Sequence, residues 1–401
     1  MRLPVLFILI TVTLDAIGIG LILPIMPDLI REVQGGDLAT AALWGGVLST
    51  TFAVMQFLFG PLLGSLSDRY GRRPVLLISL AIMAVDYLVM ALAGAIWLLV
   101  LGRLVGGITA ATHATASAYM ADISKPEDKA ANFGLIGAGF GIGFVLGPLI
   151  GGMLGELGTR APFYAAAALA ALNFVFGYFV LSETVTDRIR RPFEWRRANP
   201  FGGLKQLTRL PGIGPLMLVY FLYSVAFYVY PSVWSYFTQE QFGWSPQMIG
   251  VSLALYGIST AVVQGGLTRP MLNTFGNRRT VIGSHLVEMA AFLVIGLISS
   301  GFWLLVMIPV AALGSVLNPA LVGIMSRIAN DDQQGELQGV LTSVNALATI
   351  VAPLIMTSVF ASFTNGSVGL YLPGAPFLLS MVLMAVALSV FMRSRKPPPV
   401  S

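Results

Sequence analysis

Three carboxylates and one guanidinium lie inside long apolar runs of this sequence: Asp15, Asp86, Glu288 and Arg103. A charged group within hydrocarbon costs at least about 2.5 kcal/mol on insertion scales, so it faces a cavity or a partner and is a functional candidate. A carboxyl group kept from water favours its neutral form, whereas an approaching cation or substrate favours the anion. These residues therefore predict proton coupling without covalent catalysis. Polar contacts between helices, and for Arg103 a structural ion pair, are the alternatives.

Both histidines lie near these charged groups in the sequence. His285 precedes Glu288 by about one helical turn, so the two side chains can share a helix face. His113 follows Arg103 by ten residues on the same predicted span. Further metal ligands are missing, so no metal site is predicted. Each imidazole is either a hydrogen-bonded buried group or a member of a proton relay.

Apolar helices in a bilayer must position these groups. The chain has 401 residues, of which 56% are hydrophobic and 10% charged, against roughly 25% charged in a soluble domain. Its net charge of +5 is spread over short stretches without interleaved aromatic residues, which argues against nucleic-acid binding. Cysteine is absent, which excludes disulfides and thiolate metal sites. Runs of roughly 20 uncharged residues can each cross a hydrocarbon core. Twelve spans are predicted, at 5–27, 42–65, 74–94, 97–121, 131–155, 161–182, 212–238, 246–268, 280–300, 302–325, 336–361 and 373–393.

The cations predict the orientation of these spans. All but three of the 23 Lys and Arg fall on the side that holds both termini; Arg31 and Arg160 fall on the other side, and Arg103 lies within a span. This asymmetry predicts a multi-pass protein of the inner (cytoplasmic) membrane with cytoplasmic termini. The first span is too long for a signal peptide and is expected to be retained. Residues 183–210 carry seven cations and form either a cytoplasmic linker or, in part, an amphipathic segment on anionic lipid.

A repeat at a constant offset of 205 residues relates the two halves of the sequence. It predicts a six-helix bundle over 1–182, the linker over 183–210 and a second bundle over 211–401. Parallel repeats of this kind place a substrate cavity near the membrane midplane, between the halves. The matching pairs are Gly60 and Gly265, Tyr70 and Phe275, Gly71 and Gly276, Arg73 and Arg278, Met120 and Met325, Ile123 and Ile328, Gly134 and Gly339, and Pro148 and Pro353.

The predicted loop after the second span reads GPLLGSLSDRYGRRP, from Gly60 to Pro74. Its first glycines permit close helix approach, its aspartate can pair with a cation or cap the next helix, and its arginines mark the cytoplasmic face. A basic turn without a function is the alternative. The pattern resembles the signature loop of the major facilitator superfamily. That resemblance implies an all-α fold of twelve transmembrane helices in two pseudo-symmetric bundles, with this loop as a conformational latch. The latch residues are Gly60, Gly64, Asp68, Arg69, Gly71, Arg72 and Arg73.

The fifth span reads GLIGAGFGIGFVLGPLIGG, in which glycines three and four apart line one face and a proline bends the helix. Packing glycines are common in membrane helices, but this spacing resembles the antiporter motif of twelve-span drug/proton exporters. The resemblance to tetracycline/proton antiporters runs over nearly the whole chain, including DAIGIGLILPIMP at 15–27, LGRLVGGITAAT at 101–112, AYMADI at 118–123, APFYAAAALAALNF at 161–174 and GELQGVLTSVNALATIVAPLI at 335–355. The motif residues are Gly134, Gly143, Gly147, Pro148, Gly151 and Gly152.

The resemblance connects Arg103 with proton exchange, and it places an acidic residue of the ninth span near the position of Glu288. One departure concerns the eighth span, YGISTAVVQGG, which has Ser259 or Thr260 where tetracycline antiporters tend to have histidine. This departure weakens the tetracycline assignment. Polar and aromatic residues in apolar spans could line the cavity, or could instead join helices or lie at the lipid interface. These cavity candidates are Gln56, His113, Tyr228, Trp234, Asn318, Gln338 and Asn345.

Three functions remain open. A proton-coupled antiporter that exports a drug-like small molecule by alternating access is the first, and a proton-coupled importer of a small nutrient is the second. A sensor or scaffold without transport is disfavoured, because buried charges are costly. There is no phosphate-binding loop for ATP. The expected partners are the substrate, protons and the bilayer, with no cofactor, and the expected functional unit is a monomer.

Overall fold

The computed structural model describes residues 3–110, 112–187, 190, 192–194, 199–207, 210 and 212–394, without the side chains of His113, Ala130, Leu204 and Asp331. Within these residues the chain forms helices and no strand. An α-helix bonds its backbone polar groups within one segment, which is what a chain this apolar requires in hydrocarbon. The predicted all-α fold is confirmed. Two compact units contain the helices, Met1–Asp37 with Thr51–Pro200 and Trp244–Ala254 as unit 1, and Leu38–Thr50 with Phe201–Gly243 and Leu255–Ser401 as unit 2.

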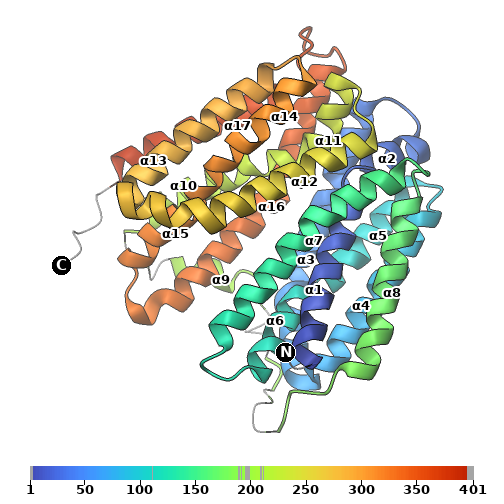
Figure 1. Ribbon diagram of the computed structural model, residues 1–401, viewed down its shortest axis with the longest axis vertical. Helices are drawn as coiled ribbons and strands as arrows, with labels where there is room; N and C mark the ends of the chain where they lie inside the picture. Colours follow the sequence, from blue (N-terminus) through green and yellow to red (C-terminus); the bar gives the residue numbers. More distant parts are fainter. Residues whose placement is uncertain are drawn as a thin grey trace. The chain divides into compact units, whose positions relative to one another are not determined.

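The core of unit 1 lies where α1 packs along α7 and α8, and where α4 packs against α8, α5 and α6. Figure 1 shows α1, α4, α7 and α8 side by side. Phe7, Ile8 and Tyr119 are fully buried in this core. The helices of the unit are α1 (Leu3–Ile22), α2 (Met26–Gln34), α4 (Arg72–Leu92), α5 (Ile96–Thr109), α6 (Thr112–Ile123), α7 (Lys129–Gly155) and α8 (Ala161–Val180).

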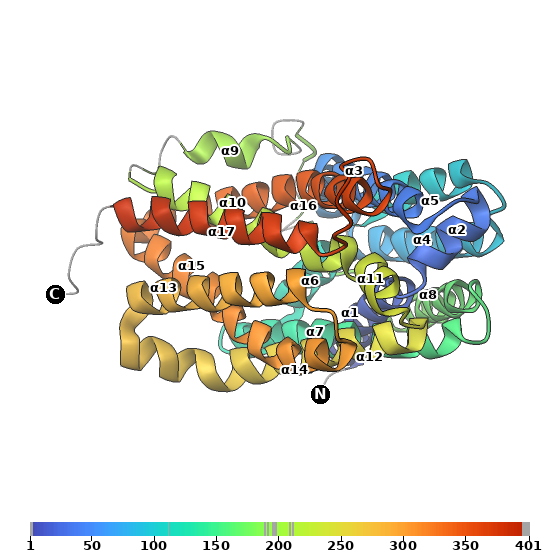
Figure 2. The same ribbon diagram turned by 90° about the horizontal axis from the view of Figure 1, so that it is seen from above.

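In unit 2, α10 packs against α17 and α16, and α13 packs against α17 and α15. The short helix α9, within the predicted linker, packs on α16 (Figure 2). The helices are α9 (Gly202–Gln206), α10 (Gly214–Phe227), α11 (Val229–Phe242), α13 (Thr268–Leu297), α14 (Gly301–Ala312), α15 (Leu317–Ile328), α16 (Gln334–Thr364) and α17 (Ala375–Arg393), with a π-helix at Val263–Leu267 and 3₁₀ turns at Leu313–Val316 and Asp331–Gln333.

Two helices contribute to both units. The first turns of α3 (Leu38–Tyr70) belong to unit 2, where the Thr50 hydroxyl donates to the Ile350 carbonyl at 2.9 Å. The first turns of α12 (Pro246–Val262) belong to unit 1, where Gly250 lies against the backbone of Pro148. Each unit therefore includes a segment from the other half of the sequence.

Eleven helical segments of the described chain are long and apolar enough to cross a membrane. One of them, Pro246–Leu297, has 52 residues and holds two of the twelve predicted spans. These two spans separate at Gly276, whose φ of 72° and ψ of 160° are not helical. The predicted spans 97–121, 212–238 and 302–325 each consist of two successive helices. The membrane-spanning character of the predicted segments is confirmed.

Candidate functional site

Asp86 lies on the face of α4 that packs against α5. Its side chain is buried, with 6% exposed, and a Cβ atom at Gly102 or Gly106 would lie 2.7 Å from one of its carboxylate oxygens. The two glycines, one turn apart on α5, therefore make room for the carboxylate. Its Oδ1 accepts no hydrogen bond from the described residues. A buried acceptor without a donor is costly to maintain, so this carboxyl group is suited to binding a proton.

The half-buried Arg103 lies beside Gly102 on α5. One of its amino groups, Nη2, donates to the Met90 sulfur at 2.5 Å, and its guanidinium carbon lies 5.5 Å from the centre of the Phe52 ring. Among the described residues Arg103 forms no ion pair with Asp86. Arg103 is held by sulfur and aromatic contacts, which leave its charge available to other groups.

Tyr87, on α4, connects the three predicted coupling residues of unit 1. It lies within electrostatic range of Asp15, Asp86 and Arg103. Its hydroxyl packs against α1, since a Cβ atom at Gly18 would lie 2.9 Å from the hydroxyl oxygen. Asp15 is half-buried on α1. The structure thus gathers the predicted residues around a tyrosine that the sequence did not single out; its place next to Asp86 was the available signal.

The second buried acid, Glu288 on α13, is 2% exposed. A Cβ atom at Gly314 would overlap its carboxylate, so this glycine is needed where α13 meets the 3₁₀ turn at Leu313–Val316. The fully buried His285 donates from Nδ1 to the Val281 carbonyl at 2.9 Å, and its ring stacks with Phe391 of α17. Among the described residues no hydrogen bond joins the histidine to Glu288.

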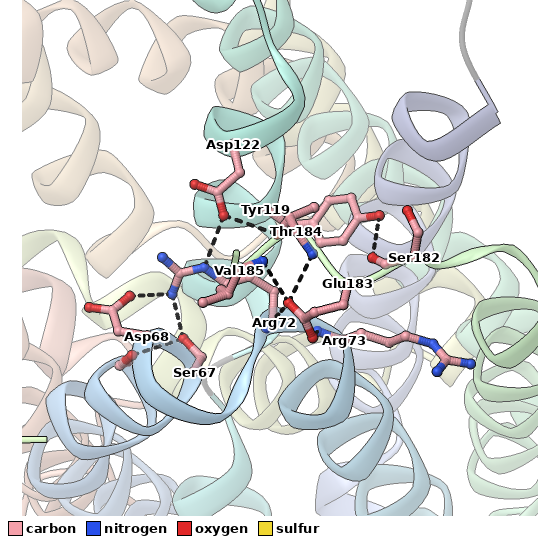
Figure 3. Close-up of polar contacts among 11 residues, drawn as sticks. Ser67, Asp68, Arg72, Arg73, Tyr119, Asp122, Ser182, Glu183, Thr184 and Val185 are labelled. Carbon is pink, nitrogen blue, oxygen red and sulfur yellow. Dashed lines mark hydrogen bonds and ion pairs between the residues drawn. The ribbon is translucent and has the colours of Figure 1, made fainter. Parts of the chain in front are cut away.

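Arg72, at the beginning of α4, is the centre of the predicted latch (Figure 3). Its Nη1 contacts Asp68 Oδ1 at 2.5 Å and donates to Ser67 Oγ at 2.6 Å, while its Nε contacts Asp122 Oδ2 at 3.3 Å. The hydroxyl of Thr184 donates to the same Asp122 oxygen at 3.0 Å. One guanidinium thereby joins α3, α4 and α6, a multidentate arrangement for which arginine is better suited than lysine.

Glu183 caps the beginning of α4 from outside that helix. Its Oε1 accepts hydrogen bonds from the backbone amides of Arg72, Thr184 and Val185, each at 2.9 Å, and its Oε2 accepts one from Arg73 at 3.2 Å. The free amides and positive dipole end of a helix favour a carboxylate at this position. The sequence prediction missed both Glu183 and Asp122. Their only local signal was an acidic residue at the end of an apolar span.

The segment Gly60–Pro74 is not the loop that the sequence pattern predicts. α3 continues to Tyr70 and α4 begins at Arg72, so Gly71, with φ of 113°, is the only break. A Cβ atom at Gly60 or Gly64 would meet no atom of the described residues within 4 Å, so the structure does not show the predicted close helix approach at these glycines. Apolar side chains continue into this segment, which lets the helix extend further than the charges suggested.

The other two arginines of the latch make separate contacts. Arg73 donates to the Tyr178 carbonyl at 2.9 Å and lies over the Tyr178 ring, which ties α4 to α8. The guanidinium of Arg69 lies 5.1 Å from the centre of the ring of its neighbour Tyr70.

The glycine face of α7 packs against α1. A Cβ atom at Gly143 would lie 2.7 Å from Ala16 Cβ, one at Gly147 would lie 2.7 Å from the Ile17 carbonyl oxygen, and one at Gly151 would overlap the Leu21 backbone. Three glycines at four-residue spacing thus allow the two backbones to touch. Of the other members of the predicted motif, Pro148 lies against both Gly20 of α1 and Gly250 of α12, and Gly152 lies against Pro246 of α12. A Cβ atom at Gly134 would meet no described atom within 4 Å.

The predicted cavity residues do not share one environment. Gln56, Asn318 and Gln338 are exposed. Tyr228 and Asn345 are half-buried, and Trp234 is buried within an aromatic cluster. The side chain of His113 lies outside the described part of the chain. Hydropathy cannot distinguish a polar side chain that faces a cavity from one that faces a neighbouring helix.

Duplicated helical bundles with buried ionisable groups are typical of membrane transporters. The chain belongs to the Major Facilitator Superfamily, whose sequence profile matches residues 8–215 and again residues 216–401. Two successive matches agree with the repeat of six helices, and the predicted fold class is confirmed.

Several known proteins are similar to this chain in sequence or in structure. The chain is 40% identical over 370 residues to the class C tetracycline resistance protein of Escherichia coli, covering 92% of this chain and 93% of that protein. It is 35% identical over 402 residues to the class D tetracycline resistance protein of Salmonella ordonez, covering 100% of this chain and 99% of that protein. The human organic anion transporter MFSD10 is similar in structure, with a TM-score of 0.70, 26% identity, and coverage of 97% and 99%. A bacterial homologue of the human lysosomal transporter Spinster, in an inward-facing and occupied conformation, has a TM-score of 0.78 and 17% sequence identity. The match covers 97% of this chain and 96% of that chain, and at this identity it supports the fold alone.

Proposed function

We propose that this chain exports a tetracycline-like drug from the cytoplasm in exchange for protons by alternating access. The observation that carries the proposal is the buried carboxyl group of Asp86, which lies against two glycines and shares the neighbourhood of Tyr87 with Arg103. End-to-end similarity to tetracycline resistance proteins supports the substrate class.

Proton and substrate movement are coupled because both change the charge that is favoured at Asp86. A proton bound to Asp86 neutralises a buried carboxylate, and the nearby Arg103 favours the charged form, so the protonation state depends on what else occupies the neighbourhood. Asp15 acts with Asp86 through the same tyrosine, and Glu288 with His285 supplies a second titratable group in unit 2. Substrate arriving from the cytoplasm favours proton release, and proton binding from the other side favours substrate release.

The Arg72 network serves as the latch of this cycle. Two carboxylates and one hydroxyl hold the guanidinium across three helices, and such a network has discrete formed and broken states. Its arginines would lie at the cytoplasmic side of the inner membrane, as would both termini. We expect a monomer to carry out the whole cycle, since both units lie in one chain.

The test uses everted membrane vesicles with an imposed proton gradient. Wild-type vesicles should accumulate tetracycline, and Asp86→Asn should reduce the gradient-driven accumulation by roughly 5- to 150-fold, the usual size of coupling between two sites. Exchange of labelled for unlabelled tetracycline without a gradient should persist. Asp187→Asn, at an exposed carboxylate outside the spans, is the matched control.

Different outcomes identify the alternatives. Accumulation that requires the opposite vesicle orientation indicates a proton-coupled importer on the same fold. Binding of tetracycline without movement in either orientation indicates a sensor. Gradient-driven accumulation that is unchanged in Asp86→Asn refutes the coupling role of this carboxyl group.

A further inference from the structure

Glu288 and Asp86 occupy similar places in the two units but have different partners. Each lies in the third predicted span of its half and faces a glycine of the fourth: Asp86 faces Gly102 and Gly106 of α5, and Glu288 faces Gly314 of the 3₁₀ turn that follows α14. Asp86 lies close to Arg103, whereas the residue 205 positions after Arg103 is Ile308, a buried apolar side chain. Among the described residues Glu288 forms no ion pair with any lysine or arginine, and its Oε2 accepts no hydrogen bond.

Aromatic side chains take the place of the arginine around Glu288. Tyr223, Tyr230 and Tyr256 all lie within electrostatic range of its carboxylate. Tyr230 is the centre of this group, with its ring centroid 5.4 Å from that of Tyr256 and 5.5 Å from that of Phe292, which follows Glu288 by one turn on α13. The group combines one carboxylate with several ring faces, and both attract a positive charge.

Two buried polar atoms of this group have no hydrogen-bond partner among the described residues: Glu288 Oε2 and the Tyr230 hydroxyl. Ser315 Oγ, next in the sequence to the Gly314 that faces Glu288, has none either. An unsatisfied buried hydroxyl costs about as much as a lost hydrogen bond, and a buried unpaired carboxylate costs more. A ligand that carries both a positive charge and an N–H donor would satisfy them. A substituted ammonium does so: its N–H can donate to the carboxylate while its alkyl groups pack on the rings.

We propose that Glu288, Tyr230 and Tyr256 form a subsite for the substituted ammonium group of the exported molecule. The subsite rests on the proposed export function and adds the chemical group by which unit 2 recognises its substrate. The ammonium group of the ligand supplies to Glu288 the positive charge that Arg103 supplies to Asp86 in unit 1, and the ring faces favour a cation over an anion. A site that only carried a proton would need the carboxylate but not the three tyrosines.

The experiment compares tetracycline, which carries a dimethylammonium group, with 4-dedimethylaminotetracycline, which lacks it. Wild-type vesicles should accumulate tetracycline at an apparent affinity at least about tenfold higher, as expected for a charge-assisted contact with cation–π support. Glu288→Gln should bring the two affinities within about twofold by weakening tetracycline alone. Purified protein in nanodiscs should show the same change in equilibrium binding. Glu336→Gln, the same exchange at the beginning of α16, should retain the preference.

Retained binding of the neutral analogue shows that Glu288→Gln is folded. Should that variant bind neither compound, Tyr256→Leu decides, with an expected threefold or greater loss of the preference. Wild-type vesicles that accumulate neither compound overturn the export function, and the subsite with it. Vesicles that accumulate both compounds with equal affinity, or a Glu288 or Tyr256 variant that keeps the preference, overturn the subsite alone.

Discussion

Units 1 and 2 break a helix in the same way at positions 205 residues apart. Gly71 has φ of 113° between α3 and α4, and Gly276 has φ of 72° within α13. Two residues later, Arg73 donates to a carbonyl of α8 at 2.9 Å, and Arg278 donates to a carbonyl of α17 at 3.3 Å. The backbone geometry and one arginine contact are therefore common to both units.

The charges around this break differ. In unit 1 Arg72 pairs with Asp122, whereas the corresponding residues of unit 2 are Asn277 and Arg327. These two also touch, but through a single hydrogen bond of 3.3 Å from the guanidinium to the amide oxygen. The side-chain contact between corresponding helices, α4 with α6 and α13 with α15, is therefore present in both units, but it is an ion pair only in unit 1. We expect the stability of unit 1 to depend more strongly on charge substitutions and on salt.

The loops before α8 and α17 show the same contrast. Arg160 donates to Glu32 at 2.9 Å and to the Ala91 carbonyl at 2.7 Å in unit 1. In unit 2 the Tyr371 hydroxyl donates to Glu240 at 2.7 Å. Partial burial, together with the hydrogen bond to Glu240 and its charge, raises the pKa of Tyr371 to about 12. Unit 2 therefore uses a neutral donor where unit 1 uses a cation.

Alanine at the two glycine breaks should have the largest and most unequal effects. Gly71→Ala forces a side chain into positive φ, at about 1–3 kcal/mol, and its Cβ would overlap the Glu183 carboxylate that caps α4. Gly276→Ala should carry only the cost of the strained backbone, because its Cβ atom would meet no described atom within 4 Å. Thermal unfolding followed by tryptophan fluorescence should rank Gly71→Ala well below Gly276→Ala. Equal losses would show that the Glu183 contact contributes nothing.

The helix α7 and its counterpart α16 differ at a position of close helix packing. Where α7 has Gly147 against α1, the corresponding residue of α16 is Ala352. Gly147→Ala places a Cβ atom 2.7 Å from a backbone oxygen, and overpacking of this kind costs about 1–3 kcal/mol. Gly134→Ala, with open space, is the control and should leave the unfolding temperature unchanged. A neutral Gly147→Ala would mean that the two helices separate readily.

Charge substitutions at Asp122 in unit 1 and at Asn277 in unit 2 should change the stability of the protein in opposite directions. Asp122→Asn removes one carboxylate from Arg72, which should lower stability by about 1–2 kcal/mol. Asn277→Asp gives Arg327 an acidic partner and should raise stability by up to about 1 kcal/mol. Unfolding temperatures at low and high salt check both, because added salt should reduce each difference. Same-sign changes would refute the proposed contrast between the units.

The smallest effect is expected at Tyr371. Tyr371→Phe removes one exposed hydrogen bond and should lower stability by less than about 1 kcal/mol. A raised pKa means that the neutral hydroxyl is favoured in the folded protein, so this contribution is complete below the ordinary tyrosine pKa and is lost as the pH rises through about 12. Absorbance titration at alkaline pH, with Tyr371→Phe as the reference, should show one tyrosine that ionises late.

The sequence predicted the helices and the repeat well because both depend on local patterns. Apolar runs long enough for a bilayer can form only helices here. The same residues, Gly71 and Gly276 among them, recur 205 positions apart in the sequence. Helix ends were less predictable: α3 runs to Tyr70 because apolar side chains continue past Gly60 and because Asp68, near the end of the helix, pairs with Arg72.

The candidate site was predictable residue by residue but not as an assembly. The cost of buried charge identifies Asp86 and Glu288, yet it says nothing about Tyr87 or Tyr230, since tyrosines are common in membrane helices. Asp122 is 50 residues from Arg72, and such a contact depends on how α4 packs against α6. Packing also decides that Gly147 contacts α1, while a Cβ atom at Gly60 would meet no described atom within 4 Å.

The cap by Glu183 has a consequence for dividing the chain into two co-expressed fragments. A cut after Asp187 keeps the Glu183 carboxylate on the same fragment as its four hydrogen-bond donors. These donors are the backbone amides of Arg72, Arg73, Thr184 and Val185. A cut just before Glu183 separates the carboxylate from the first turn of α4, which would then begin with bare amides. Fragment complementation should therefore succeed at the first junction and fail at the second, although the two lie only a few residues apart.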